Sequence, residues 1–408
     1  VDSDKIAGTL LDEGLVSTND VASADLVVVN TCAFIEEARE ESINAVLALE
    51  QERMPGARIV VTGCMAERYG EELAEALPEV DSVAGFGVPV NLTRKPPGLS
   101  VVAEAPVPKF DLLNLRRPAS DLPWAYVKIA EGCDRKCGFC AIPSFRGPQN
   151  SREVDSILRE IDELGAREIV LVAQDLASFG SDHGHRGSIV SLVNAVANRV
   201  DRVRLLYLYP SDLTDELVEA VLSTGVPYFD LSLQHVAKTH LRRMRRWGDG
   251  ERFLNRIAEI RRASPDATFR SNFIVGYPGE TEDDQAELLA WMHEAQLDWC
   301  GLFTYSREDG TYAAGLPNEV PAELMSERHI ELSELQDTIT ATRRDQLVGS
   351  RIEVLVDAPG VARSHREAPE IDGVVKVPHA LQVGGIYEVL VTRSDGLDVE
   401  AELGEINQ

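Results

Sequence analysis

The chain has 408 residues, which is long enough for two or three domains with separate cores. Its 40 basic and 68 acidic side chains give a formal net charge of -28, which disfavours nucleic-acid phosphates and favours basic partners. No apolar run approaches the roughly 18 residues that a membrane helix needs, and residues 1–5 do not resemble a signal peptide. We therefore expect a cytoplasmic protein without a membrane partner.

The first segment predicts a small open α/β unit. The short β-branched runs 25–30 and 58–62 are typical of buried parallel strands, and the Glu- and Ala-rich stretch 34–51 between them suits a crossover helix. This pattern places Cys32 and Cys64 just beyond two strand ends, where ligands bind in open α/β sheets. A single cysteine there is usually a small core residue, but two at equivalent positions favour a metal site.

Residues 1–15 have the pattern of a helix. A unit of this kind normally has a strand and a loop before such a helix, so we expect the sequence to begin within the fold. Because two thiolates cannot complete a cluster, a third ligand is expected, most economically from that upstream strand.

A proline-rich stretch then separates this unit from the rest of the chain. Seven prolines lie between residues 88 and 123, which predicts a linker. Beyond it, apolar β-rich runs alternate with helical patterns, at residues 125–130, 168–173, 202–208, 228–233, 268–275 and 299–304. The alternation predicts parallel strands, and six units fall short of the eight of a closed TIM barrel. We therefore expect a partial six-stranded β/α barrel with its polar strand ends at one mouth.

Three cysteines follow the first of these strands on one short loop. Cys133, Cys137 and Cys140 have the spacing C-x3-C-x2-C, with no fourth cysteine close by. Structural zinc sites and ordinary iron-sulfur clusters are closed by four ligands, so three thiolates predict a metal centre with an open coordination position. The alternative is a zinc site closed by a distant His or Cys. Cys300 lies inside an apolar strand and is expected to pack in the core.

The residues at the other strand ends are weaker candidates for site residues. Gln174, Asp175, Gln234 and His235 are the kind of residues that also serve as ordinary loop or capping residues. The segment 276–280 is more specific, because glycines near a strand end let the backbone approach a ligand closely. It predicts a contact with a cofactor.

The last segment predicts a third unit. Residues 321–348 have the pattern of a long charged helix, and short strands at 352–356, 373–377 and 386–391 then indicate a small antiparallel barrel. Residues 346–408 contain five basic and eleven acidic side chains, a net charge of -6, which lacks the basic face that RNA requires.

The fold class is therefore α/β with three domains. Their predicted boundaries, with the linker, are 1–95, 96–121 (linker), 122–344 and 345–408.

The cysteine loop resembles that of the radical S-adenosylmethionine enzymes, including the aromatic Phe139 before its last cysteine. The resemblance extends over nearly the whole chain and is to the methylthiotransferases, which consist of a cluster-binding domain, a radical domain and a TRAM domain. Four motifs fall in the order of that family: Asn30-Thr31-Cys32, Gly63-Cys64, Glu131-Gly132-Cys133 and Gly276-Tyr277-Pro278-Gly279-Glu280.

The resemblance implies two 4Fe-4S clusters and S-adenosyl-L-methionine. Three of the cysteines, Cys133, Cys137 and Cys140, would hold the first cluster, with Phe139, Gly276 and Glu280 at the cofactor. An auxiliary cluster would be held by Cys32, Cys64 and a third cysteine of an N-terminal strand and loop absent from this sequence. The auxiliary cluster is thus expected to be incompletely ligated in this chain, which indicates a truncated or misassigned start.

Segments 173–175, 232–235 and 367–373 are similar to the branch of the family that methylthiolates an aspartate of ribosomal protein S-twelve. The resemblance implies radical abstraction of a hydrogen from the aspartate β-carbon, sulfur capture at the auxiliary cluster and methyl transfer from a second cofactor molecule. No protein side chain is predicted as a general base, so the catalytic residues are unknown.

The implied partners are ribosomal protein S-twelve or the small ribosomal subunit, and a reductant protein. The acidic chain would attract a basic ribosomal protein and repel tRNA. Two alternatives stay open: a tRNA adenosine methylthiotransferase, and a non-catalytic, zinc-stabilised ribosome-assembly protein.

Overall fold

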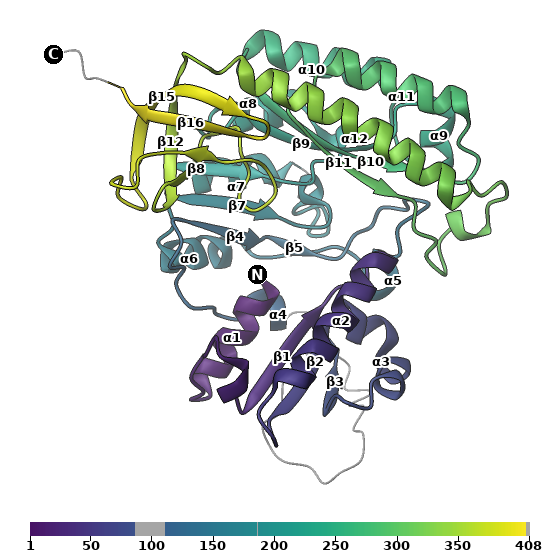
Figure 1. Ribbon diagram of the computed structural model, residues 1–408, viewed down its shortest axis with the longest axis vertical. Helices are drawn as coiled ribbons and strands as arrows, with labels where there is room; N and C mark the ends of the chain where they lie inside the picture. Colours follow the sequence, from purple (N-terminus) through teal and green to yellow (C-terminus); the bar gives the residue numbers. More distant parts are fainter. Residues whose placement is uncertain (86–110, 186, 405–408) are drawn as a thin grey trace.

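The computed structural model describes residues 1–85, 111–185 and 187–404 (Figure 1). In Figure 1 an N-terminal unit lies below a central barrel. A small C-terminal barrel packs beside the amino ends of the central strands. Most of the predicted linker lies outside the described residues. Its described part contains a short helix, α4 (Asp111–Asn114), where Leu113 is buried and its carbonyl accepts a hydrogen bond from Lys5.

The N-terminal unit is an open parallel sheet with the strand order β1-β2-β3. The predicted βαβ pattern is present, because α2 crosses between the paired strands β1 and β2. Thr31 pairs with Gly63 at the carboxyl ends of those strands, so Cys32 and Cys64 follow neighbouring positions of the sheet. The elements are β1 (Leu26–Thr31), β2 (Arg58–Gly63), β3 (Ser82–Ala84), α1 (Asp2–Asp12), α2 (Glu36–Glu52), α3 (Cys64–Ala76) and the 3-10 helix η1 (Val21–Ser23).

The six predicted strands of the central region are all present and parallel where they pair. Two three-stranded sheets, β4-β7-β8 and β9-β10-β11, are joined by a bridge between Leu208 and Leu231. The described strands show no pairing between β4 and β11, so this is a partial barrel. The strands are β4 (Trp124–Lys128), β7 (Glu168–Val172), β8 (Arg202–Leu205), β9 (Tyr228–Gln234), β10 (Thr268–Val275) and β11 (Trp299–Thr304).

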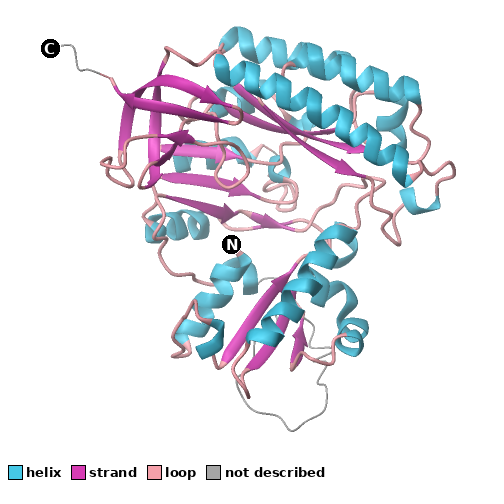
Figure 2. Cartoon of the chain, in the orientation of Figure 1, coloured by secondary structure: helices cyan, strands magenta, loops and turns pink. Residues whose placement is uncertain are grey.

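Helices cover the outer face of this barrel (Figure 2). Helix α6 shows why they do so, because Ile157, Ile161 and Leu164 recur at helical spacing and are buried against the strands. The helices are α6 (Val154–Leu164), α7 (Ser188–Ala197), α8 (Asp215–Leu222), α9 (Lys238–Arg243), α10 (Gly250–Ala263), α11 (Glu282–Ala295) and α12 (Ala322–Asp345). Shorter elements are β5 (Ala130–Glu131), α5 (Ile142–Arg146), β6 (Asn150–Ser151), η2 (Leu176–Ser178), η3 (Pro210–Asp212) and η4 (Ala313–Gly315).

The C-terminal unit is a closed barrel of order β12-β13-β14-β16-β15. All of its pairs are antiparallel except β14 with β16. The strand expected at 373–377 forms only at residues 375–376. The segment before it packs against the central barrel and does not pair within this one. The strands are β12 (Arg351–Ala358), β13 (Val361–Arg363), β14 (Val375–Lys376), β15 (Ile386–Asp395) and β16 (Asp398–Leu403). The part of the chain that the structure describes contains no candidate membrane-spanning helix.

Candidate active site

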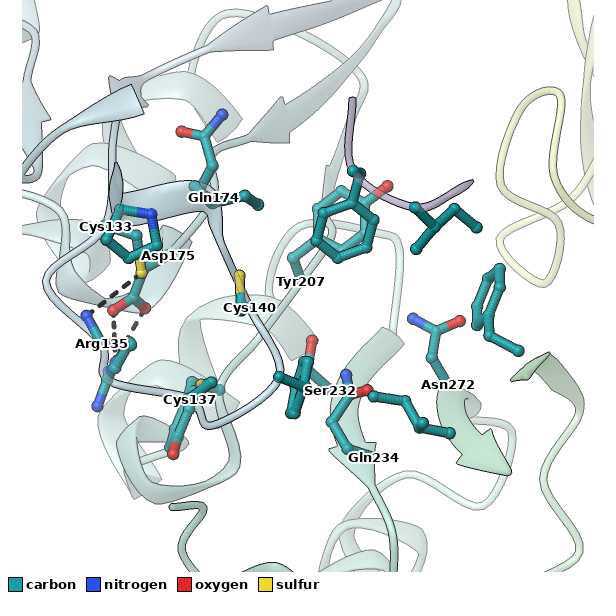
Figure 3. A pocket seen from close by; sticks show the side chains of 18 of the residues that line it. Cys133, Arg135, Cys137, Cys140, Gln174, Asp175, Tyr207, Ser232, Gln234 and Asn272 are labelled. Atoms are coloured by element: carbon teal, nitrogen blue, oxygen red, sulfur yellow. Dashed lines mark hydrogen bonds and ion pairs between the residues drawn. The ribbon is translucent and has the colours of Figure 1, made fainter. Parts of the chain in front are cut away.

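A cavity of about 520 Å³ opens at the carboxyl ends of the central strands. Its walls come from the cysteine loop, from the ends of the central strands and from the loop after β1, as Figure 3 shows for part of them. The lining residues include Phe34, Ile35, Cys133, Arg135, Cys137, Phe139, Cys140, Gln174, Asp175, Tyr207, Tyr209, Ser232, Gln234, Arg246, Asn272, Ile274, Phe303, Tyr305, Ser306 and Glu308. Polar strand ends thus gather at one mouth, as expected for a β/α barrel.

The local backbone fixes the course of the cysteine loop. Gly132 has a φ of +77°, and a Cβ there would collide with the carbonyl of Pro148. A glycine is therefore required at the entrance to the loop. Within the loop, the amide of Cys133 donates to the carbonyl of Gly147 over 3.1 Å, and the amide of Gly138 donates to that of Met244 over 2.8 Å. These bonds hold all three thiols at the cavity.

Burial makes two of the three loop thiols hard to deprotonate. Burial raises the pKa of Cys133 to about 11 and that of Cys140 to about 12, so both need a metal to displace their protons at neutral pH.

Two arginines, one inside the cysteine loop and one outside it, lie beside its thiols. The guanidinium groups of Arg135 and Arg246 lie 3.9 and 4.0 Å from the ring centre of Tyr209. Arg135 is held by Asp175, with 2.6 Å between Nε and Oδ2, and Arg246 donates from Nη1 to the Cys137 Sγ over 3.4 Å. Arg246 therefore offers the Cys137 sulfur a charged hydrogen-bond donor, whereas the charge of Arg135 is balanced by Asp175.

Two residues of the cavity wall have a left-handed backbone. Tyr207 has a φ of 63° and Gln234 a φ of 73°, values that residues other than glycine seldom adopt. The amide of Tyr207 donates to Oδ2 of the buried Asp230 over 3.0 Å. Such backbone strain concentrates at functional sites, where the surrounding structure maintains it.

Cys32 and Cys64 lie near one another at the end of the N-terminal sheet and do not line the cavity. Cys32 is exposed, but Phe34 and Ile35, which follow it closely, are cavity residues. Cys64 begins α3, and its Sγ accepts a hydrogen bond of 2.8 Å from Nη2 of Arg146. Burial raises the pKa of Cys64, and the charge of Arg146 opposes that rise.

Ion pairs join the N-terminal unit to the cavity wall. Glu308, a cavity residue, receives Arg39 and Arg68 from the N-terminal unit at 2.8 and 2.6 Å. Arg146, the partner of Cys64, also pairs with Glu131 at the start of the cysteine loop. These contacts bring the two groups of cysteines to the same side of the central barrel.

The remaining predicted site residues are placed differently. Phe139 lines the cavity, whereas Gly276 and Glu280 lie outside its lining. Glu280 accepts a 2.9 Å hydrogen bond from the Gly276 amide and is 2.8 Å from Arg328, and the cofactor role of both residues stays a prediction. His235 is buried away from the cavity, and its Nδ1 accepts a 3.0 Å bond from the Ala237 amide. Cys300 packs against the main core, as predicted.

Sequence reasoning missed Arg246, Tyr207, Ser232 and Asn272 as residues of the cavity. The alternation of side chains along a strand could have identified two of them, Ser232 and Asn272. Ser232 and Gln234 are two residues apart on one strand, as are Asn272 and Ile274, and such pairs share a face of the sheet.

Three family models match the chain. They are described as Uncharacterized protein family UPF0004, at residues 1–85, Radical SAM superfamily, at residues 127–292, and TRAM domain, at residues 348–403. Among solved structures, the radical S-adenosylmethionine methyltransferase TsrM from Kitasatospora setae is similar, with a TM-score of 0.51 over 94% of this chain and 77% of that one. Its sequence is 13% identical, so the likeness concerns the fold alone.

Curated relatives match over nearly the full length. A protein named Ribosomal protein uS12 methylthiotransferase RimO from Saccharopolyspora erythraea is 40% identical, over 98% of this chain and 91% of that protein. Proteins of the same name from Salinispora tropica and Moorella thermoacetica are 39% and 41% identical, over 98% and 92% of this chain and 92% and 90% of their own lengths. The chain belongs to the RimO family of radical SAM methylthiotransferases.

Proposed function

We propose that this enzyme adds a methylthio group to the β-carbon of an aspartate in ribosomal protein uS12. The observation that carries the proposal is the placement of three thiols on one loop at the mouth of a cavity walled by the central strand ends. The full-length similarity to proteins named for this activity supports it.

Cys133, Cys137 and Cys140 would hold a 4Fe-4S cluster and leave one coordination position for S-adenosyl-L-methionine. When bound, the two supply the radical chemistry that activates a carbon–hydrogen bond. Arg246 donates a hydrogen bond to Cys137 and would stabilise its thiolate form. Phe139 and the other apolar residues of the wall would exclude water from the reacting atoms.

Cys32 and Cys64 are proposed as ligands of a second 4Fe-4S cluster, close to the first site. The hydrogen bond from Arg146 would stabilise a thiolate at Cys64, and Arg146 reaches it from α5, directly after the cysteine loop. The ion pairs of Glu308 would hold this part of the molecule against the cavity.

The charge of the chain supports a basic protein substrate. A formal charge of -28 would steer a ribosomal protein, or the small subunit that carries it, toward the enzyme and repel tRNA. We place the reaction in the cytoplasm, with a reductant protein as electron donor.

The test is the intact mass of uS12 after anaerobic incubation with reconstituted enzyme, reductant and S-adenosyl-L-methionine. The proposal predicts a methylthio increment on uS12 and none on tRNA in a parallel incubation. An increment on tRNA alone would establish the tRNA adenosine activity instead. Colourless protein with tightly bound zinc and no product would support the non-catalytic alternative.

A further inference from the structure

The segment 364–373 of the C-terminal unit enters the base of the central barrel, opposite the mouth. Ala368 is 1% exposed and packs with Tyr228 and Trp299. The indole Nε1 of Trp299 donates to the carbonyl of Arg366 over 2.6 Å, and the hydroxyl of Tyr126 donates to that of Pro369 over 2.8 Å. The C-terminal unit therefore closes the floor of the barrel.

The segment carries a buried charge to that floor. The side chain of Asp372 is 1% exposed, and its Oδ2 accepts from the Tyr228 hydroxyl at 2.6 Å and from the Ala368 amide at 2.8 Å. Its Oδ1 has no hydrogen-bond partner among the described residues and lies 3.6 Å from Nε of Arg270 on β10. The carboxylate is thus positioned to orient one edge of the guanidinium.

The other edge of Arg270 reaches toward the cavity. Its Nη1 donates to Oδ1 of Asp230 and to Oδ1 of Asn272, both over 3.2 Å. Asn272 is itself a cavity residue, and a Cβ at the neighbouring Gly301 would collide with its Oδ1. The side-chain oxygen of Asn272 therefore accepts the Arg270 donor and packs closely over Gly301.

Asp230 links the same arginine to the strained backbone of the wall. One of its carboxylate oxygens receives Arg270, and the other receives the amide of Tyr207, which has a positive φ and lines the cavity. Arg270 is thus linked to Asn272 by one hydrogen bond, and to Tyr207 by two hydrogen bonds through Asp230. Arg270 therefore connects the floor of the barrel with two residues of the cavity wall.

We propose that Arg270, oriented by Asp372, is a positioning residue that sets Asn272 and Tyr207 in the cavity, so that the C-terminal unit shapes the substrate side of the active site. The assay of methylthiolated uS12 rests on the proposed function, whereas the comparison of the Asn272 and Tyr207 conformations does not.

The experiment compares Asp372→Asn with Glu388→Gln in the full-length, cluster-loaded enzyme. Asn keeps an acceptor for Tyr228 but removes the charge that faces Arg270. Glu388 is an exposed carboxylate of the same unit, 3.1 Å from Arg351, and serves as the control. We expect Asp372→Asn to keep its iron and its cleavage of S-adenosyl-L-methionine, while methylthiolated uS12 per 5'-deoxyadenosine released falls by about tenfold or more.

A double-mutant cycle with Asn272→Ala separates positioning from general destabilisation. If Asp372 acts through Arg270 on Asn272, adding Asn272→Ala to Asp372→Asn costs little beyond the larger single effect. If Asp372→Asn does not fold, the cycle of Arg270→Lys with Asn272→Ala carries the same expectation, because one ammonium cannot replace the bonds of a guanidinium. Two results would overturn the proposal. One is a double variant whose loss of product equals the product of the two single losses, and the other is an Asp372→Asn enzyme that behaves as Glu388→Gln does.

A crystal structure of the Asp372→Asn protein provides a readout that needs no substrate. We expect Tyr207 to leave its positive φ or the Asn272 amide to turn, and unchanged conformations at both would contradict the proposal. Wild-type enzyme that leaves uS12 unmodified would instead reject the proposed function and leave this structural result standing.

Discussion

The cysteines of this chain differ in what surrounds them. The thiols of the 133–140 loop face a cavity beside two arginines, whereas Cys300 packs against the main core. We expect Cys133→Ala to lose the iron of the loop cluster, because alanine cannot replace the proposed thiolate ligand. Cys300→Ala, the matched control, should retain wild-type iron and visible absorbance. Equal iron in the two variants, measured after identical anaerobic reconstitution, would exclude Cys133 as a ligand.

His235 makes the stability of the protein depend on pH. Burial, with the charge of His240 as a smaller cause, lowers the pKa of His235 to about 3, against about 6.5 in an unfolded chain. Between these values the unfolded state binds the extra proton, so the contribution of His235 to stability falls as the pH drops below 6.5.

The matching variant is His235→Asn, whose side-chain oxygen can accept the bond from the Ala237 amide. Between pH 7.5 and pH 5, the wild type should lose about 2 kcal/mol of unfolding free energy more than the variant. Urea unfolding at the two pH values measures this difference. Parallel losses in both proteins would show that His235 does not titrate in this way.

At the residue scale, the sequence predicted the cysteines but not the side chains around them. The three thiols of the loop share one local motif, so their proximity follows from a few residues of backbone. Arg246, Tyr207 and Asn272 reach the cavity from three separate strands or loops. Their meeting depends on the twist and register of the barrel, which local patterns do not contain.

At the element scale, α11 shows how a helix start is defined. Thr281 accepts a bond from the Asp284 amide, and the Asp284 side chain accepts from the Thr281 amide, which forms a capping box. We expect Thr281→Ala to lower the unfolding free energy by about 1 kcal/mol, because both bonds of the cap are disturbed. The control is Thr338→Ala, at an exposed threonine inside α12 that bonds back to Glu334. It should be neutral or slightly stabilising in the same urea titration, and equal losses would contradict the role of the cap.

The elements themselves were largely predictable, because each strand of the central barrel is a short apolar run followed by a helical pattern. The segment 364–373 was not. It has no periodicity, and its structure is set by Tyr228, Trp299 and Arg270, which are distant in sequence. The strand expected to begin at residue 373 was therefore too long at its start.

At the scale of the whole molecule, Glu308 joins the N-terminal unit to the barrel. Its side chain is 3% exposed and pairs with both Arg39 and Arg68. Glu308→Gln leaves two arginines without their counter-charge, so we expect amide hydrogen exchange in α2 and α3 to accelerate by about tenfold or more. Glu319→Gln removes the exposed partner of Arg307 and should leave that exchange unchanged. Unchanged exchange in Glu308→Gln would show that these pairs do not hold the unit in place.

We propose that the cavity at the barrel mouth activates the aspartate of uS12. The most direct measurement uses uS12 that carries deuterium at its aspartate β-carbons, incubated anaerobically with reconstituted enzyme, reductant and S-adenosyl-L-methionine. We predict that deuterium appears in the released 5'-deoxyadenosine and that the same uS12 gains the methylthio group. Methylthiolated uS12 accompanied only by unlabelled 5'-deoxyadenosine would show that the hydrogen is not taken from the aspartate β-carbon in this way.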